Sequence, residues 1–133
     1  MREAEIDIHT GTERVIDITD RVAGFIPDAG AGLLNIFVPH ATAGVAIMET
    51  GSGSEADLVG ALLRLLPRDD RYRHSHGSPG HGADHVLPAI ISPSVSIPVS
   101  DGRLGLGIWQ RIVLVDLNQD NPDRRVRLSF FEG

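Results

Sequence analysis

Hydrophobic and polar positions alternate along much of the chain, in short runs separated by Gly, Pro and Asp. Near the N-terminus, Ile6 and Ile8 alternate with acidic residues, and a second short apolar run occupies residues 15–18. Such alternation predicts strands, and the simplest interpretation of these two runs is an antiparallel pair. The apolar runs at 33–38, LLNIFV, and at 43–48 predict two more strands, of which the first is buried. The N-terminal third is therefore expected to be mostly β.

Two segments have helical spacing instead. Thr19 is a good cap for a short helix that carries Val22, Phe25 and Ile26 and stops at Pro27. A longer helix is expected from Ser54, where Asp57 three residues on resembles a capping box, to Pro67. Its apolar face consists of Leu58, Leu62, Leu63, Leu65 and Leu66.

The apolar pattern then vanishes over residues 68–88, where Gly, Pro, His and Asp dominate. This composition predicts a loop of about 20 residues, a length that in a compact domain is usually functional or disordered.

The last third returns to a β pattern. Residues 94–99 alternate, and Asp101-Gly102 is a strong hairpin signal. The run LGLGIWQRIVLVDL is expected to be one long strand or a strand with a bend. Gly105 and Gly107 in it suggest the close approach of another backbone or of a ligand. Residues 125–131 close the sheet. The sequence predicts one domain over residues 1–133, α+β and dominated by antiparallel strands, as a two-layer β-sandwich with short helices at one side.

Composition removes several kinds of chemistry. With no cysteine, the chain has no disulfide, no thiolate nucleophile and no sulfur ligand for zinc. All twelve basic residues are arginine, which excludes a Schiff-base lysine and a phosphate-loop lysine. The net charge of −6 argues against non-specific nucleic-acid binding. Since no apolar run approaches the roughly 18 residues of a membrane span and the start lacks a signal-peptide core, a cytoplasmic protein is expected.

Histidine is the clearest candidate for chemistry, because four of the six histidines fall within residues 72–85. Together with His40, at the end of a predicted strand, His74 and His85 could enclose a divalent cation at about 2.0–2.1 Å and leave a fourth position open. The local pairs HSH and HGADH are alternatives, and the residues alone favour a solvated polar loop over a metal site.

Other side chains are weaker candidates. Glu49 follows a strand whose end should lie near His40 and could act as a general base or orient an imidazole; Asp84 is a second choice. Arg103 could bind a phosphate or carboxylate, and Trp109, expected on the same strand and face, could stack on a ring. Core packing is the simpler interpretation of Trp109. No Ser or Thr forms a nucleophile–base pair by sequence.

Four segments in this order, VPHATAGVAIME, YRH, ADH and SVSIPVSDGRLGLGIWQRIVLVDL, resemble the YjbQ-like family, often labelled secondary thiamine-phosphate synthase enzyme. The resemblance runs from about residue 4 to residue 131. It implies a β-rich sandwich that forms a homotrimer, with histidines around a divalent metal, zinc being expected, near the subunit boundary. Its implied metal ligands are His40, His74 and His85. Glu49 and Arg103, which match family positions, are the catalytic candidates. Trp109 and Gln110, which match the WQ motif, and Thr42, by its proximity to His40, are the cofactor-binding candidates.

Two departures from the family pattern concern the site. Ala41 stands where the family usually has Thr, and the loop between His74 and His85 carries the additional histidines His76 and His81. His76 and His81 could add metal ligands or be solvated, and the second interpretation is favoured.

The resemblance implies a metal-dependent enzyme on a small phosphorylated metabolite, joining a phosphorylated thiazole to a pyrimidine diphosphate with loss of pyrophosphate. The sequence itself shows no glycine-rich phosphate loop. A metal-assisted hydrolase and a non-catalytic trimeric metal- or ligand-binding protein therefore remain alternatives at this point.

Overall fold

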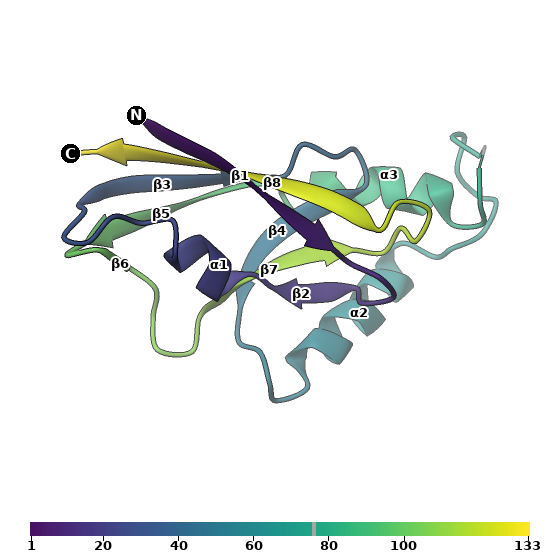
Figure 1. Ribbon diagram of the computed structural model, residues 1–133. Coiled ribbons are helices and arrows are strands. Elements are labelled where there is room, and N and C mark those ends of the chain that lie inside the picture. The colour runs from purple at the N-terminus through teal and green to yellow at the C-terminus, as the bar shows by residue number, and fades with distance from the viewer. Residues whose placement is uncertain (76) are drawn as a thin grey trace.

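In the computed structural model, which describes residues 1–75 and 77–133, two antiparallel sheets pack face to face (Figure 1). The larger sheet has the order β1-β8-β3-β5-β6 and the smaller one the order β2-β7-β4. The strands are β1 (Arg2–His9), β2 (Val15–Asp17), β3 (Gly32–Phe37), β4 (Ala43–Met48), β5 (Ser94–Ser100), β6 (Arg103–Leu104), β7 (Arg111–Asp116) and β8 (Asp123–Glu132). The helices are α1 (Thr19–Ala23), α2 (Ser54–Leu65) and α3 (His81–Ile90). The expected antiparallel α+β sandwich is confirmed.

The continuous apolar run of β7 is explained by burial on both of its faces. Ile112 and Leu114 face the core between the two sheets, together with Phe130 of β8. Val113 and Val115 face a second core, in which α2 and α3 cover the other side of the small sheet through Leu62, Leu66, Ala83 and Leu87. A strand between two apolar layers has no polar face, so its alternation disappears. α2 and α3 thus form a third layer on one side, whereas α1 contributes Val22 to the core between the sheets.

The first two strands do not pair with each other, contrary to the simple interpretation. β1 pairs with β8, with Arg2 opposite Phe130, and β2 pairs with β7 in the other sheet. The turn between β1 and β2 carries the chain from one sheet to the other, which local alternation cannot reveal.

The long strand expected after the hairpin is interrupted. Asp101 and Gly102 have positive φ of 50° and 72° and make the expected tight turn between β5 and β6. A loop over residues 105–110 then separates β6 from β7, so Arg103 and Trp109 do not share a strand. Gly105 lies against the backbone of Pro98, where a Cβ would come within 2.8 Å of the carbonyl oxygen. Trp109 is 72% exposed and is therefore not a core residue.

Helix starts also differ in detail. α2 begins after Gly53 without a side-chain cap, and Glu55 rather than Asp57 turns back to accept a hydrogen bond, from the N–H of Gly51. α1 begins at Thr19, whose N–H donates to Asp17. None of the helices in the described part of the chain is long and apolar enough to cross a bilayer.

The largest correction is α3, because it occupies part of the segment expected to be a loop. Its apolar contacts come from Ala83 and Leu87, one turn apart, with Pro88 inside the helix. The Gly, His and Pro residues around this pair hide the helical spacing. Figure 1 shows α3 at one end of the molecule, beside the turn between β7 and β8.

Candidate metal centre

His81 and His85 are one turn apart on α3 and meet at their ring nitrogens. Their Nε2 atoms are 3.0 Å apart, a distance at which one ring donates an N–H to the other. Residues four apart share one face of a helix, so the formation of α3 is what brings the two rings together. The helix starts directly after Gly80, which has a left-handed φ of +87°.

His74 approaches the same face from the segment before α3. Its ring centroid is 4.3 Å from that of His85 and 5.0 Å from that of His81. Gly82 permits this approach, because a Cβ there would lie 2.4 Å from the carbonyl oxygen of His74 and 2.6 Å from Cβ of Tyr72. The Tyr72 hydroxyl in turn donates to the carbonyl oxygen of Pro67 at 2.8 Å.

The three imidazoles form a donor set suited to a divalent transition metal. One ligand nitrogen from each of His74, His81 and His85 can be chosen so that all three lie within 4.8 Å of one another. Zinc held at about 2.0–2.1 Å places neighbouring ligand atoms roughly 3.3 Å apart, so small side-chain movements suffice. Three histidine ligands and one open position are typical of catalytic zinc. The residues present therefore fit such an ion.

A buried carboxylate anchors the turn of α3 that carries these histidines. Asp84 is 1% exposed and receives two hydrogen bonds from the Arg68 guanidinium, which follows α2. It also accepts a hydrogen bond from Nδ2 of Asn118 at 3.0 Å, just beyond β7. α3 is thereby tied to both α2 and the small sheet. Gly80 allows this contact, because a Cβ there would lie 2.4 Å from the Arg68 guanidinium.

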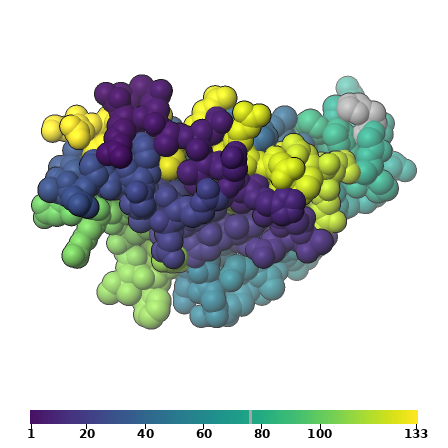
Figure 2. All heavy atoms as spheres, viewed as in Figure 1, coloured from purple at the N-terminus to yellow at the C-terminus, as the bar shows by residue number. Residues whose placement is uncertain are grey.

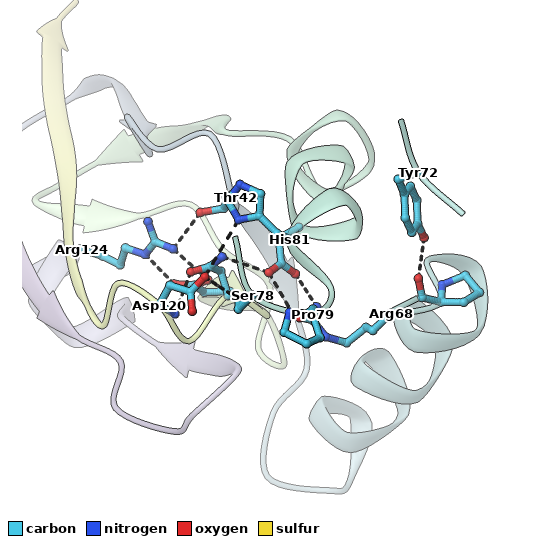
Figure 3. A network of polar contacts seen from close by, with 12 residues as sticks. Thr42, Arg68, Tyr72, Ser78, Pro79, His81, Asp120 and Arg124 are labelled. Carbon is cyan, nitrogen blue, oxygen red and sulfur yellow. Dashed lines mark hydrogen bonds and ion pairs between the residues drawn. The ribbon is translucent and has the colours of Figure 1, made fainter. Parts of the chain in front are cut away.

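A second buried ion pair continues this polar network toward the turn between β3 and β4. Arg124, 3% exposed, donates to both carboxylate oxygens of Asp116 and, at 2.8 Å, to the Thr42 hydroxyl. Asp116 also accepts the N–H of Asn118 at 3.0 Å. Burial raises the pKa of Asp116, and the hydrogen bonds from Arg124 oppose that shift. Figure 3 shows Arg124 and Thr42 at one side of the network and Arg68 at the other.

The open side of the histidine cluster is acidic. A cavity of about 120 Å³ is lined by His74, His81, Asp69, Asp70 and the segment 77–80. Asp69 pairs with Arg71, and the hydrogen bond from Arg71 lowers the pKa of Asp69. Asp120 adds a carboxylate 4.0 Å from Nδ1 of His81 (Figure 3). Cations are favoured at such a site, because the surrounding carboxylates offset their charge.

The structure places His40 outside this group, in another cavity of about 590 Å³ that includes His9, Arg124 and Arg125. Its Nε2 accepts the N–H of Arg125 at 2.9 Å. Burial lowers the pKa of His40, and the nearby charge of Arg124 lowers it further. His40 is thus suited to be a neutral acceptor here. Of the three ligands expected from the sequence, His74 and His85 come together, joined by His81.

The remaining candidates do not converge on the cluster. Glu49 is exposed between β4 and α2, 3.5 Å from the Ser52 hydroxyl. Arg103 lies on the edge strand β6, and Gln110 accepts the N–H of Gly107 within the loop that carries Trp109. In Figure 1, β6 and this loop lie at the opposite end of the molecule from α3. Thr42 belongs to the buried network rather than to an open pocket.

His81 is the residue that sequence reasoning interpreted wrongly. Its side chain is 17% exposed and packs against His74 and His85, whereas a solvated loop histidine was expected. The spacing of His81 and His85 by four residues, beside Gly80 and Gly82, is the signal that could have indicated it. His76 lies outside the described residues. Arg68 and Asn118 had no sequence signal, since each acts through a distant partner.

Comparison with known proteins gives the chain a family. The family model described as UPF0047 protein YjbQ-like matches residues 4–133. The chain belongs to this family. A UPF0047 protein of Mycobacterium tuberculosis is 66% identical over 128 residues, covering 96% of each chain. One from Methanothermobacter thermautotrophicus is 34% identical over 119 residues, covering 86% of this chain and 80% of the relative.

Solved structures of similar proteins share the fold of this YjbQ-like chain. A hypothetical protein of Aeropyrum pernix superposes with a TM-score of 0.91 at 30% identity, over 100% of both chains. A conserved hypothetical protein of Thermus thermophilus gives a TM-score of 0.85 at 28% identity, over 96% of this chain and 99% of the other. The names of these relatives state no activity.

Proposed function

We propose that this YjbQ-like protein is a metal-dependent enzyme that acts on a small phosphorylated metabolite. In this proposal His74, His81 and His85 hold one divalent ion, with zinc as the first candidate. The observation that carries the proposal is the group of three ligand nitrogens within 4.8 Å of one another. A divalent ion at such a site supplies Lewis acidity toward a bound oxygen.

The chain's own residues hold the metal ligands in position and provide a proton acceptor. Asp84 fixes the turn that bears His81 and His85 through its bonds to Arg68 and Asn118. Rigid support of this kind is what holds ligands near a productive geometry. The carboxylate of Asp70, on the wall of the same cavity, is the candidate to accept a proton from water entering it, because Asp69 is paired with Arg71.

Thiamine-phosphate synthesis is the named case that the family resemblance implies. A cation beside the departing pyrophosphate would neutralise its charge, which is the requirement of that reaction. Neither Glu49 nor Arg103 contacts the histidine cluster, so the proposal does not assign them the base and anion-binding roles expected from the sequence.

A metal-assisted hydrolase is the second candidate, and the acidic cavity favours it. Asp69 and Asp70 line the cavity beside the histidines in which water would bind. Hydrolysis needs only water and one substrate, whereas the synthase reaction also requires the thiazole partner. Turnover of phosphate esters without that partner would identify the hydrolase.

The first test is metal analysis by mass spectrometry on the wild type and the variants His74→Ala, His81→Ala and His85→Ala. About one divalent ion per chain in the wild type, lost in all three variants, is expected because a single ion needs the whole donor set. His9→Ala is the matched control, since His9 is exposed and pairs with Asp123. It should retain the ion.

Substrate assays then separate the candidate functions. Zinc-loaded protein is assayed with the phosphorylated thiazole and pyrimidine diphosphate together, and with a panel of phosphate esters and amides. Activity must disappear in His81→Ala to be assigned to this site. Metal binding without turnover of any substrate would instead support a non-catalytic metal- or ligand-binding protein. Absence of bound metal, even after addition of zinc, manganese or nickel, would contradict the proposal.

We also propose that the chain forms the homotrimer that the family resemblance implies. Ile108 and Trp109, adjacent in the loop between β6 and β7, are 91% and 72% exposed. In Figure 2 the light green part of the chain around residues 105–110 projects from the surface. Large neighbouring apolar side chains on a projecting loop are typical of a contact surface.

A further inference from the structure

A cavity lined by two arginines adjoins the histidine cluster. It has a volume of about 250 Å³, and its walls include Arg14, Arg68, Ser78 and Asp120. Ser78 and Pro79 line both this cavity and the one over the histidines, so this short segment separates the two. A ligand group held here therefore lies beside the candidate metal centre rather than in it.

Arg68 is fixed at this cavity and keeps hydrogen-bonding capacity. Its guanidinium donates two bonds to Asp84 and one, at 3.5 Å, to the carbonyl oxygen of Pro79. A guanidinium carries five N–H donors, so two remain for a ligand. The bonds to Asp84 also hold the group in place, which lowers the entropic cost of binding.

Arg14 supplies the second guanidinium of this cavity, and its backbone is held by a hydrogen bond. Its carbonyl oxygen accepts the N–H of Asp116 at 2.9 Å, which fixes the turn before β2. Among residues 1–75 and 77–133, no carboxylate forms an ion pair with its side chain. The Arg14 guanidinium is thus available to an anion that enters the cavity.

Asp120, a carboxylate that also lines this cavity, interacts with Ser78 and lies near the histidines. Oδ2 of Asp120 accepts the Ser78 hydroxyl at 2.6 Å and lies 4.0 Å from Nδ1 of His81 (Figure 3). Arg14 and Arg68 carry two positive charges against the two negative charges of Asp84 and Asp120. A divalent ion on the histidines makes the sum positive, which favours an anion in the arginine cavity.

We propose that the cavity between Arg14 and Arg68 binds the phosphate group of a phosphorylated metabolite. This rests on the proposed function and names where the substrate's phosphate is held. Arginine suits the role because its planar fork donates to two phosphate oxygens at once. The site replaces Arg103, which lies at the other end of the molecule, as the anion-binding group.

Isothermal titration calorimetry tests this proposal with inorganic phosphate, glycerol phosphate and glycerol as probes. The proteins are wild type, Arg14→Gln and the matched control Arg127→Gln, in which the exposed arginine of β8 is paired with Glu5 of β1. Each is titrated with and without zinc. We expect Arg14→Gln to weaken phosphate and glycerol phosphate binding about 10-fold or more, because one charge-assisted contact is lost. Arg127→Gln should bind as the wild type does, and glycerol should not bind.

The outcomes separate this proposal from the metal proposal. If the wild type takes up no zinc but phosphate binding still depends on Arg14, the metal proposal fails and the arginine site stands. If phosphate binding is lost in His81→Ala yet unchanged in Arg14→Gln, phosphate binds only the ion and the arginine site is refuted. Absence of phosphate binding in the wild type, with and without zinc, refutes it as well. Zinc affinity should be equal in wild type and Arg14→Gln.

Discussion

His40 and His81 show how the environment of a residue decides its chemistry. Both are histidines in polar sequence contexts, yet His81 packs among imidazoles while His40 accepts a backbone N–H from Arg125. Because burial and the charge of Arg124 lower the pKa of His40, its neutral form is favoured in the folded protein. Asp116, the ion-pair partner of Arg124, opposes part of this lowering of the pKa.

A dependence of stability on pH follows from His40. Since its folded-state pKa lies below the ordinary 6.5, the unfolded chain binds a proton first as pH falls. The stability contributed by neutral His40 is therefore present above about pH 6.5 and is lost as pH falls from there toward the folded-state pKa. Urea unfolding between pH 7.5 and 5.5, with chelator present to remove metal effects, measures the change.

His40→Gln provides the comparison, because Gln keeps an acceptor for the Arg125 N–H but does not titrate. The other titratable or charged groups near His40 are Arg124, Asp116 and Arg125, with Asp7, His9 and Asp123 on the wall of the same cavity, and all are unchanged in this variant. The free energy of unfolding should fall less steeply below pH 6.5 in His40→Gln than in the wild type. Identical pH profiles would show that His40 does not contribute.

At the level of elements, the position of α3 is decided by polar contacts as well as by its apolar face. Ala83 and Leu87 belong to the same core as Val113 and Val115 of β7, while Asp84 binds Arg68 and Asn118. A carboxylate buried to this degree is costly unless its partners satisfy it. The arrangement therefore favours one orientation of the histidine-bearing turn over others with similar apolar packing.

Asp84→Asn should lower zinc affinity about 10–100-fold, the usual effect of losing an outer support of metal ligands. The free energy of unfolding should also fall by about 1–3 kcal/mol, because the Arg68 guanidinium loses its charged partner. Zinc affinity is measured by competition with a chelating dye, and stability by urea unfolding.

Val22→Ala separates positioning from stability in this experiment. Val22 is fully buried between the sheets and away from α3, so its truncation lowers stability without touching the histidine turn. It should keep the zinc affinity of the wild type. Equal losses of affinity in the two variants would mean that Asp84 acts only through overall stability.

At the scale of the whole molecule, the two ends of the sandwich differ in chemistry. α3 and the turn after β7 carry the histidines and the arginine cavity, whereas the loop after β6 carries exposed Ile108 and Trp109. In Figure 1 these features lie at opposite ends of the chain's long dimension. A contact surface on the loop leaves α3 of the same subunit accessible.

Trp109→Ser is expected to weaken the proposed trimer, because an exposed aromatic anchor contributes strongly to an interface when buried. Light scattering coupled to size-exclusion chromatography should show about three chains per particle for the wild type and fewer for Trp109→Ser at micromolar concentration. Phe131→Ser is a matched control, since Phe131 is 47% exposed but lies on β8. A monomeric wild type, or a trimer unaffected by Trp109→Ser, would contradict the role of this loop.

Local pattern determined most of the elements of this protein. The alternation at residues 94–99, the Asp101-Gly102 turn and the leucine spacing after Ser54 each predicted an element that the structure confirms. These signals succeed because the side chains involved interact with neighbours a few residues away or with one continuous core face. Family membership was also recognisable from motifs and their spacing.

Tertiary structure alone decided the candidate site. The sequence pointed to histidines at 74 and 85, but only the formation of α3 brings His81 beside them and leaves His40 in another cavity. Arg14, just before β2, and Arg68, just after α2, line one cavity together with the turn after β7. Contacts between residues far apart in the chain depend on packing and on buried charge pairs, and no local spacing encodes them.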